Sequence, residues 1–199
     1  MRRDGKTLIA YGHSWAAGDG ASSAALCFAA QSASDLGLDL DNRGVGGSGS
    51  SATAESIAVV PPPAAALYVL MTGLNDLRLG GESPSSARQY ATALRHILTA
   101  FRRTSPKALV VAVAQPYLVD YSLHAPHNRG SDPLVDLYNS VLRGAAAEHP
   151  FAALAEAGDW DPGVMLHGDT VHPNDAGHAC LARAVTEAAA AARPLWVRT

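Results

Sequence analysis

Three short apolar runs constrain the fold of this chain more than any other feature of its sequence. They span residues 7–11, 66–71 and 108–113, and each is apolar at both odd and even positions. A strand of this kind is typical of a parallel sheet whose two faces are both covered by helices. Residues 38–43 and 151–155 are weaker strand candidates. The sequence therefore predicts five strands for one sheet.

Helical patterns separate these runs. Apolar residues recur at helical spacing after Ser83-Pro84, where serine can cap a helix and proline can occupy its first position. The same pattern follows residues 131–133, a third helix is expected over residues 174–192, and a weaker stripe covers residues 22–36. Strands that alternate with helices predict an α/β fold, a three-layer α/β/α sandwich with a mostly parallel central sheet.

Length, composition and charge narrow the class of protein. The chain has 199 residues, of which 48% are hydrophobic, so it can bury a substantial core, and we expect residues 1–199 to form a single domain. The formal net charge is −3, and the 15 lysine and arginine residues are scattered. No basic stripe marks a surface for nucleic acid or for an anionic membrane, so neither is an expected partner. The sequence leaves the oligomeric state open.

The N-terminus and the cysteines bear on localisation. The apolar run after the basic N-terminal residues is too short for a signal peptide, and no run is long enough to span a bilayer. Cys27 and Cys180 are too few for a disulfide framework, and we expect both to be buried free thiols. These observations predict a soluble, cytoplasmic protein.

Polar clusters follow the predicted strands at the points where the strands end. Ser14 comes after the first strand, a glycine-rich run at residues 42–48 after the second, and Gly-Leu-Asn-Asp at residues 73–76 after the third. Ligands bind at the carboxyl ends of the strands in such sheets. A hydroxyl nucleophile, backbone N–H groups in a glycine loop and an amide donor are what acyl transfer needs, because the donors can stabilise a developing oxyanion.

A second polar group lies far along the chain, where Asp169 precedes His172 by three residues. A carboxylate beside an imidazole fixes the tautomer of the ring and stabilises the imidazolium that forms when the ring takes a proton from a nucleophile. We expect Ser14 Oγ to lie near the His172 ring, with Asp169 facing the other ring nitrogen. Taken singly, these residues also have ordinary interpretations, since serine often caps a helix and Asn75-Asp76 is typical of a turn.

Taken together and in order, the blocks resemble the SGNH hydrolases, the group that contains the GDSL esterases and lipases. The resemblance rests on residues 12–14, 42–47, 73–76 and 169–174, which extend over most of the chain. The G-x-N-D and D-x-x-H-P-N blocks are the specific ones, whereas the glycine block alone is weak.

The resemblance implies a flavodoxin-like α/β/α fold and a role for each matching residue. Ser14 would be the nucleophile, His172 the general base and then acid, and Asp169 the group that orients His172. The oxyanion hole would consist of the Ser14 N–H, the Gly47 N–H and the Asn75 side chain. No metal or organic cofactor is implied.

The sequence departs from the family pattern before the nucleophile, where His13 replaces the usual aspartate. We expect His13 to shape the turn or the rim of the pocket and not to be the general base. Only His172 has a suitably spaced carboxylate in its own motif to fix its tautomer. Within the glycine block, Gly47 is favoured over Gly46 because it stands five residues after Asn42, which suits the family pattern.

The expected function is that of a serine hydrolase that cleaves a carboxylic ester through an acyl-serine intermediate. Its substrate would be a small acylated molecule, with the acyl group on a sugar or secondary metabolite. An acyltransferase or thioesterase would use the same residues. The alternative from another class is a noncatalytic carbohydrate or metabolite binder on the same fold, which the intact set of site residues disfavours.

The sequence also bears on nucleotide binding and on metal binding. The glycine run lacks the patterns G-x-G-x-x-G and G-K-[ST], which disfavours nucleotide binding. His167, Asp169, His172 and His178 crowd one segment and are residue types that zinc accepts as ligands. A simpler interpretation makes His167 a loop residue and His178 a helix-face residue.

The segment 115–130 has no strong periodicity and is predicted to be a lid or a binding wall. Tyr117 and Tyr121 could pack on a substrate or anchor this loop, and His124 and His127 are expected to be surface or loop residues.

Asp76 and Arg78 flank the predicted amide donor Asn75. One interpretation is that both hold Asn75 by local hydrogen bonds. The alternative for Arg78 is a contact with a polar substrate.

Overall fold

The computed structural model describes residues 6–196 and contains one five-stranded, all-parallel sheet with the strand order β2-β1-β3-β4-β5. The predicted α/β sandwich with a parallel central sheet is confirmed, and each strand lies within a residue of its predicted range. The strands are β1 (Thr7–Gly12), β2 (Asp39–Gly44), β3 (Leu67–Met71), β4 (Leu109–Val113) and β5 (Ala152–Ala155).

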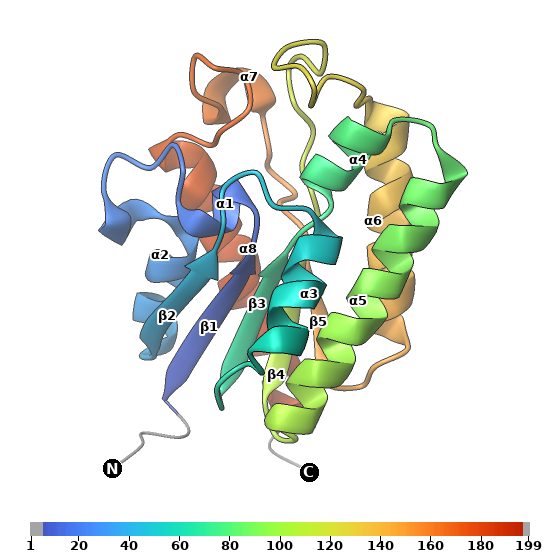
Figure 1. Cartoon of the computed structure of the whole chain (residues 1–199). Coiled ribbons are helices and arrows are strands. Elements are labelled where there is room, and N and C mark those ends of the chain that lie inside the picture. Colours follow the sequence, from blue (N-terminus) through green and yellow to red (C-terminus); the bar gives the residue numbers. More distant parts are fainter. Residues whose placement is uncertain (1–5, 197–199) are drawn as a thin grey trace.

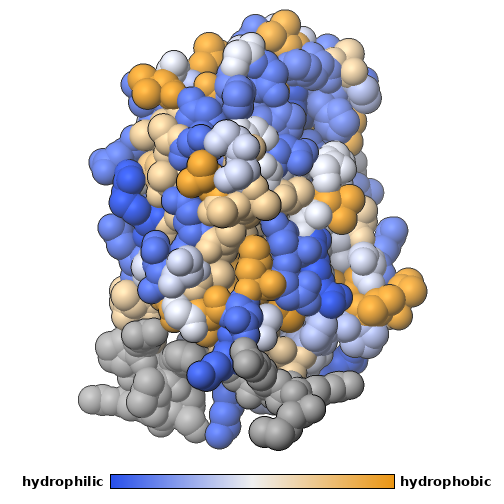
Figure 2. All heavy atoms as spheres, turned by 90° about the vertical axis from the view of Figure 1, so that its left-hand side faces the viewer, coloured by the Kyte–Doolittle hydropathy of each residue, from blue (hydrophilic) through white to orange (hydrophobic). Residues whose placement is uncertain are grey.

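The weak sequence signals of β2 and β5 have a structural reason, since these strands form the two edges of the sheet. In β2 no residue is fully buried, whereas every residue of β3 and β4 is. The edge strand carries Asp39, Asp41 and Arg43, and charged side chains on an edge discourage pairing with another sheet. Figure 2 faces this side of the molecule, where hydrophilic and hydrophobic residues are interspersed.

Helices cover both faces of the sheet (Figure 1). Alternate strand residues point to opposite faces, so Leu8 and Ala10 belong to one buried cluster and Ile9 and Tyr11 to the other. The first cluster packs against α2 (Phe28–Leu36) and α8 (Asp175–Trp196), and the second against α3 (Ser50–Val59), α5 (Pro84–Thr104) and α6 (Asp132–Ala147). None of the described helices has the length and apolar character needed to cross a membrane.

The predicted helices are present, but the helix expected over residues 22–36 is shorter. It begins at Phe28, and a 3-10 turn, η1 (Ala24–Leu26), precedes it. Helix α8 begins after Asn174, whose side chain caps it by accepting hydrogen bonds from the Ala176 and Gly177 N–H groups at 3.0 and 3.1 Å. The helices not predicted from the sequence are α3, α4 (Leu74–Gly80) and α7 (Pro162–Met165), and the helix after the serine turn is the four-residue α1 (Ser14–Ala17).

Helix α3 lacked a sequence signal because its cap comes from another part of the chain. Its N-cap is Gly49, which has no side chain to offer. The carboxylate of Asp76 instead accepts hydrogen bonds from the Ser50 N–H at 2.9 Å and the Ser50 hydroxyl at 2.5 Å. Such a long-range cap cannot be read from local residues.

The strand order places the loops after β1 and β3 side by side at the carboxyl end of the sheet. The strand order switches between these two parallel strands, because the strand after β1 is added on one side, as β2, whereas the strand after β3 is added on the other side, as β4. A crevice at such a switch point is where open α/β sheets bind ligands. Ser14 and Asn75 follow β1 and β3, so the fold brings them to this point.

Close packing between β2 and α1 predicts a large difference between two glycine substitutions. A Cβ on Gly44 would lie 2.3 Å from the Ala17 backbone nitrogen, whereas a Cβ on Gly144, inside α6, meets nothing within 4 Å. Gly44→Ala should therefore lower the free energy of unfolding by about 1–3 kcal/mol through overpacking. Gly144→Ala, the matched control, should raise it by up to about 1 kcal/mol because alanine favours a helix. Urea denaturation measures both, and equal effects would contradict the packing argument.

Candidate active site

Ser14 is the first residue of α1, at a sharp turn between strand and helix. The turn is built by Gly12, whose φ of 145° brings its backbone so close to β3 that a Cβ would lie 1.9 Å from the Met71 carbonyl oxygen. His13 caps the helix, and its Nδ1 accepts a hydrogen bond from the Trp15 N–H at 3.3 Å. Trp15 is fully buried and stacks on Trp160, with ring centroids 5.4 Å apart. The serine therefore stands on a firmly held turn.

Asp169 and His172 pair as the sequence predicts. His172 Nδ1 donates a hydrogen bond to Asp169 Oδ2 at 2.6 Å, which leaves Nε2 as the nitrogen free to exchange a proton. The other oxygen, Oδ1, accepts hydrogen bonds from the N–H groups of Val171 and His172 at 3.0 and 2.9 Å. Burial alone would raise the pKa of Asp169, but these hydrogen bonds and the His172 ring lower it to about 2. The carboxylate is therefore ionised at neutral pH.

The segment around His172 is fixed to the loop after Ser14 by several contacts. The Ser22 N–H and hydroxyl donate to the Asp175 carboxylate at 2.8 and 2.7 Å. His167 and His178 each bind a backbone carbonyl of the same loop through Nε2, that of Gly20 at 2.8 Å and that of Asp19 at 3.2 Å. These contacts set the position of the imidazole relative to the serine.

These bonds also account for His167 and His178, which the metal interpretation needed as ligands. The Nδ1 atom of His178 accepts from the Phe28 N–H at 3.2 Å, so both of its nitrogens are engaged. Within residues 6–196, no three His, Cys, Asp or Glu side chains are grouped so that they could hold a metal ion. The four residues named in the sequence therefore do not converge on a metal site.

Four of the predicted site residues line one cavity of about 280 Å³. They are Ser14, Gly47, Asn75 and His172, and Asp169 lies behind His172. The other polar side chains on its walls belong to Asp19, Arg78, His124 and His127. Ser14 Oγ makes no hydrogen bond to any described residue, His172 included. Hydrogen bonds between a nucleophile and its base are often long without substrate and tighten in the complex.

Three potential donors belong to residues that line the cavity, namely Ser14, Gly47 and Asn75. The Ser14 and Gly47 N–H groups donate no hydrogen bond within the described part of the chain. The Asn75 amide uses one N–H for the Ser48 carbonyl oxygen at 3.0 Å, which orients the amide and leaves its second N–H available. This is the donor set that an oxyanion hole requires.

Two polar residues, Asp76 and Asn42, anchor the glycine loop through contacts that the sequence did not predict. Asp76 does not bind Asn75, as one interpretation of the sequence held, but joins α4 to the start of α3 through Ser50. Asn42 binds the end of α1, where its amide donates to the Ala16 carbonyl oxygen at 2.8 Å. The glycine loop between Asn42 and Ser50 is therefore anchored at both ends.

Loop 115–130 joins β4 to α6 and covers the carboxyl end of the sheet (Figure 1). Its tyrosines are anchors, because Tyr117 binds Asp136 at 2.6 Å and Tyr121 binds Asp132 at 2.9 Å. The side chains that reach the cavity are instead those of His124 and His127, residues expected only to belong to a loop. The sequence could not predict this, because a loop has no periodic pattern that shows which of its side chains point inward.

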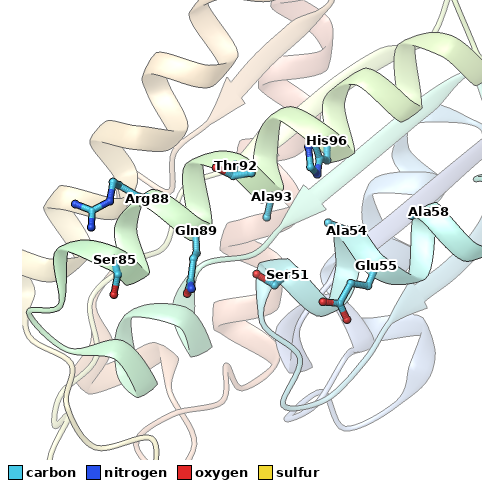
Figure 3. A pocket seen from close by; sticks show the side chains of 10 residues that line it. All are labelled: Ser51, Ala54, Glu55, Ala58, Ser85, Arg88, Gln89, Thr92, Ala93 and His96. Carbon is cyan, nitrogen blue, oxygen red and sulfur yellow. The ribbon is translucent and has the colours of Figure 1, made fainter.

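A second hollow, of about 430 Å³, lies between α3 and α5 (Figure 3). Glu55 and Ser51 line it from α3, and Gln89, Thr92 and His96 from α5. It holds none of the predicted site residues and no carboxylate–imidazole pair beside a hydroxyl. The larger hollow is therefore not the candidate active site.

Residues 10–180 match the model of the GDSL-like lipase/acylhydrolase family, which is most of the chain. The chain belongs to this family. The comparison with curated proteins gave no match.

Solved structures share the fold of this GDSL-like protein. A salicylyl-acyltransferase, SsfX3, from a tetracycline biosynthetic pathway superposes with a TM-score of 0.73 at 20% identity over 96% of this chain, which spans only 56% of that protein. A lipolytic G-D-S-L family member from Veillonella parvula gives 0.67 at 21% identity, covering 91% of this chain and 96% of that one. A carbohydrate acetylesterase family member from Sinorhizobium meliloti gives a TM-score of 0.67 at 16% identity, covering 94% of this chain and 98% of that one. At these identities the likeness establishes the fold alone.

The burial of His13 gives a pH-dependent prediction. Desolvation lowers the pKa of His13 to about 3, with a smaller contribution from the positive fields of His172 and Arg78, while Gln115 opposes the shift. In the unfolded chain His13 takes up a proton near pH 6.5, whereas in the folded protein it stays neutral at this pH. This group therefore favours folding above pH 6.5, and that contribution is lost as the pH falls towards 3.

His13→Asn retains a capping side chain but removes this titration. The free energy of unfolding of the variant should fall less steeply than that of the wild type between pH 6.5 and pH 4, by up to about 1.4 kcal/mol per pH unit. Urea denaturation across this range measures the difference, and the other histidines cancel because both proteins contain them. Identical slopes would show that His13 titrates normally.

Proposed function

We propose that this protein is a serine hydrolase that cleaves a carboxylic ester through an acyl-Ser14 intermediate. The observation that carries the proposal is the Asp169–His172 hydrogen bond of 2.6 Å beside a cavity that Ser14 also lines. Membership of the GDSL-like family supports the reaction class.

Each group has a chemical role in this proposal. His172 Nε2 takes the proton of the Ser14 hydroxyl as the oxygen attacks the ester carbonyl, and the imidazolium that forms is stabilised by the ionised Asp169. The carbonyl oxygen, now negatively charged, is bound by the Ser14 and Gly47 N–H groups and the Asn75 amide. His172 then gives its proton to the departing alcohol, and water repeats the sequence to release the acid.

Water is the favoured acceptor of the acyl group. The side chains of His172 and Asp169 are 30% and 40% exposed, so solvent reaches the base after the alcohol leaves. A cavity of about 280 Å³ lies at the lower end of the range for drug-sized ligands, about 300–1,000 Å³, which favours a small substrate. We propose a small acyl group on a polar alcohol, such as a sugar or secondary metabolite, as the substrate.

Labelling with a fluorophosphonate probe tests whether Ser14 is an activated nucleophile. Peptide mapping should find the adduct on Ser14, and His172→Asn should abolish labelling because the base is lost. His13→Asn, the control at the neighbouring histidine, should keep labelling and substantial esterase activity. Labelling that survives in His172→Asn but disappears in His13→Asn would assign the base to His13 and contradict the proposal. No labelling of the folded wild type would favour a noncatalytic binder.

The role of Asn75 predicts a specific kinetic effect. Asn75→Ala removes a donor that acts on charge present only in the transition state, so kcat on a small ester should fall about 100–1,000-fold with little change in KM. Thermal unfolding of the variant checks that the fold is retained. A rise in KM at unchanged kcat would make Asn75 a ground-state binder and overturn its assignment to the oxyanion hole.

A further inference from the structure

Arg78 is a buried cation on the wall of the candidate active-site cavity. The residue is only 3% exposed, yet it lines the cavity together with Ser14 and Asn75. It stands three residues after Asn75 in α4, so the two side chains lie on the same face of the helix. The guanidinium is therefore beside the predicted oxyanion hole.

The charge of Arg78 has no ion-pair partner among the described residues. Its Nη2 makes one long hydrogen bond of 3.5 Å to the Leu123 carbonyl oxygen, and its Nε is buried without a partner. Asp169 acts on it only through space, and Asp169 already binds His172 with one oxygen and two backbone N–H groups with the other. Buried charges are normally paired, because removal from water is costly.

A histidine with an unpartnered ring nitrogen lies on the same wall. His127 also lines the cavity, and its Nε2 is buried without a hydrogen-bond partner. Burial and the field of Arg78 lower the pKa of His127, so the ring is neutral and one of its nitrogens carries a hydrogen. An acceptor group in the cavity would pair with the Arg78 guanidinium, and the tautomer of His127 with its hydrogen towards the cavity would donate to the same group.

We propose that Arg78, assisted by His127, binds a carboxylate on the substrate, so that this enzyme prefers esters that carry a negative charge close to the scissile bond. A guanidinium matches a carboxylate through parallel N–H donors, and Arg is the residue of choice for such pairs. This inference rests on the proposed esterase function and names the substrate class of the same site. The carboxylate belongs to either the acyl part or the alcohol part.

Two matched pairs of esters distinguish these sources. On the alcohol side, 4-acetoxybenzoate is compared with 4-acetoxybenzamide. On the acyl side, monophenyl glutarate is compared with phenyl pentanoate, which has an acyl chain of the same length. For each pair the anion preference is the ratio of kcat/KM for the charged ester to that for the neutral one, after subtraction of the uncatalysed rate.

Arg78→Met removes the charge and keeps a long side chain, and it should lower the anion preference at least 10-fold for one of the two pairs. Arg78→Lys should retain part of the preference. Arg88→Gln, which removes a cation from the hollow between α3 and α5, should leave the preference unchanged. An equal loss on charged and neutral esters, or an unchanged ratio for both pairs, would overturn the proposal.

A binding measurement separates this inference from the proposed reaction. Calorimetry measures the binding of glutarate and of 4-hydroxybenzoate to Ser14→Ala, which needs no turnover. At least one of the two anions should bind. Its affinity should fall at least 10-fold in the double variant Ser14→Ala/Arg78→Met. If wild type hydrolyses no ester but this result holds, the reaction fails and the carboxylate site stands. If the esters are hydrolysed but neither anion binds, the carboxylate site fails and the reaction stands. Should Arg78→Met not fold, competitive inhibition of the wild type by glutarate, with glutaramide as the neutral control, decides the same question.

Discussion

The site depends on hydrogen bonds that join two parts of the chain about 150 residues apart. Ser22 and Asp175 are 153 positions apart in sequence, and His178 lies 150 positions from Phe28 and 159 from Asp19. Each contact ties the stretch between the nucleophile and the start of α2 to the segment around His172 and the first turn of α8. Closing so long a loop costs entropy, and the buried sheet and helices provide the favourable free energy that offsets it. The hydrogen bonds then fix the position of the base relative to the nucleophile, which matters because a shift of 1 Å between the two can cost about 100-fold in rate.

The segment that carries the base is also held in a strained conformation. Thr170 lies between Asp169 and His172 with φ of 63°, a region that β-branched residues rarely occupy. The turn is maintained because Asp169 Oδ1 binds two N–H groups beyond it, and because His124 Nε2 donates to the Asp169 carbonyl oxygen at 2.8 Å. Strain of about 1–3 kcal/mol at such a position persists only where the surroundings fix it. As a result, the His172 imidazole is already oriented before the substrate binds.

Much of the fold could be predicted from the sequence because its signals are local. Central strands β3 and β4 are buried on both faces, and Asn174 caps the helix that follows it. The blocks of the candidate site follow from strand order, since strands of a parallel sheet end at one edge. What the sequence did not reveal depends on contacts at long range. Helix α3 has its cap on another helix, and the loop histidines turn inward only because the chain on either side is anchored.

His13 links the departure from the family pattern to the charge of the cavity. The family resemblance places an aspartate before the nucleophile, and a carboxylate there could cap the turn as the His13 Nδ1 does. His13 lies close enough to Arg78 for the guanidinium to help lower its pKa. The same positive field would attract a carboxylate at this position, and the carboxylate would neutralise Arg78 from within the protein. A neutral imidazole supplies the cap without the charge, so the guanidinium stays uncompensated towards the cavity. The His13 cap therefore adds no negative charge beside the proposed carboxylate site.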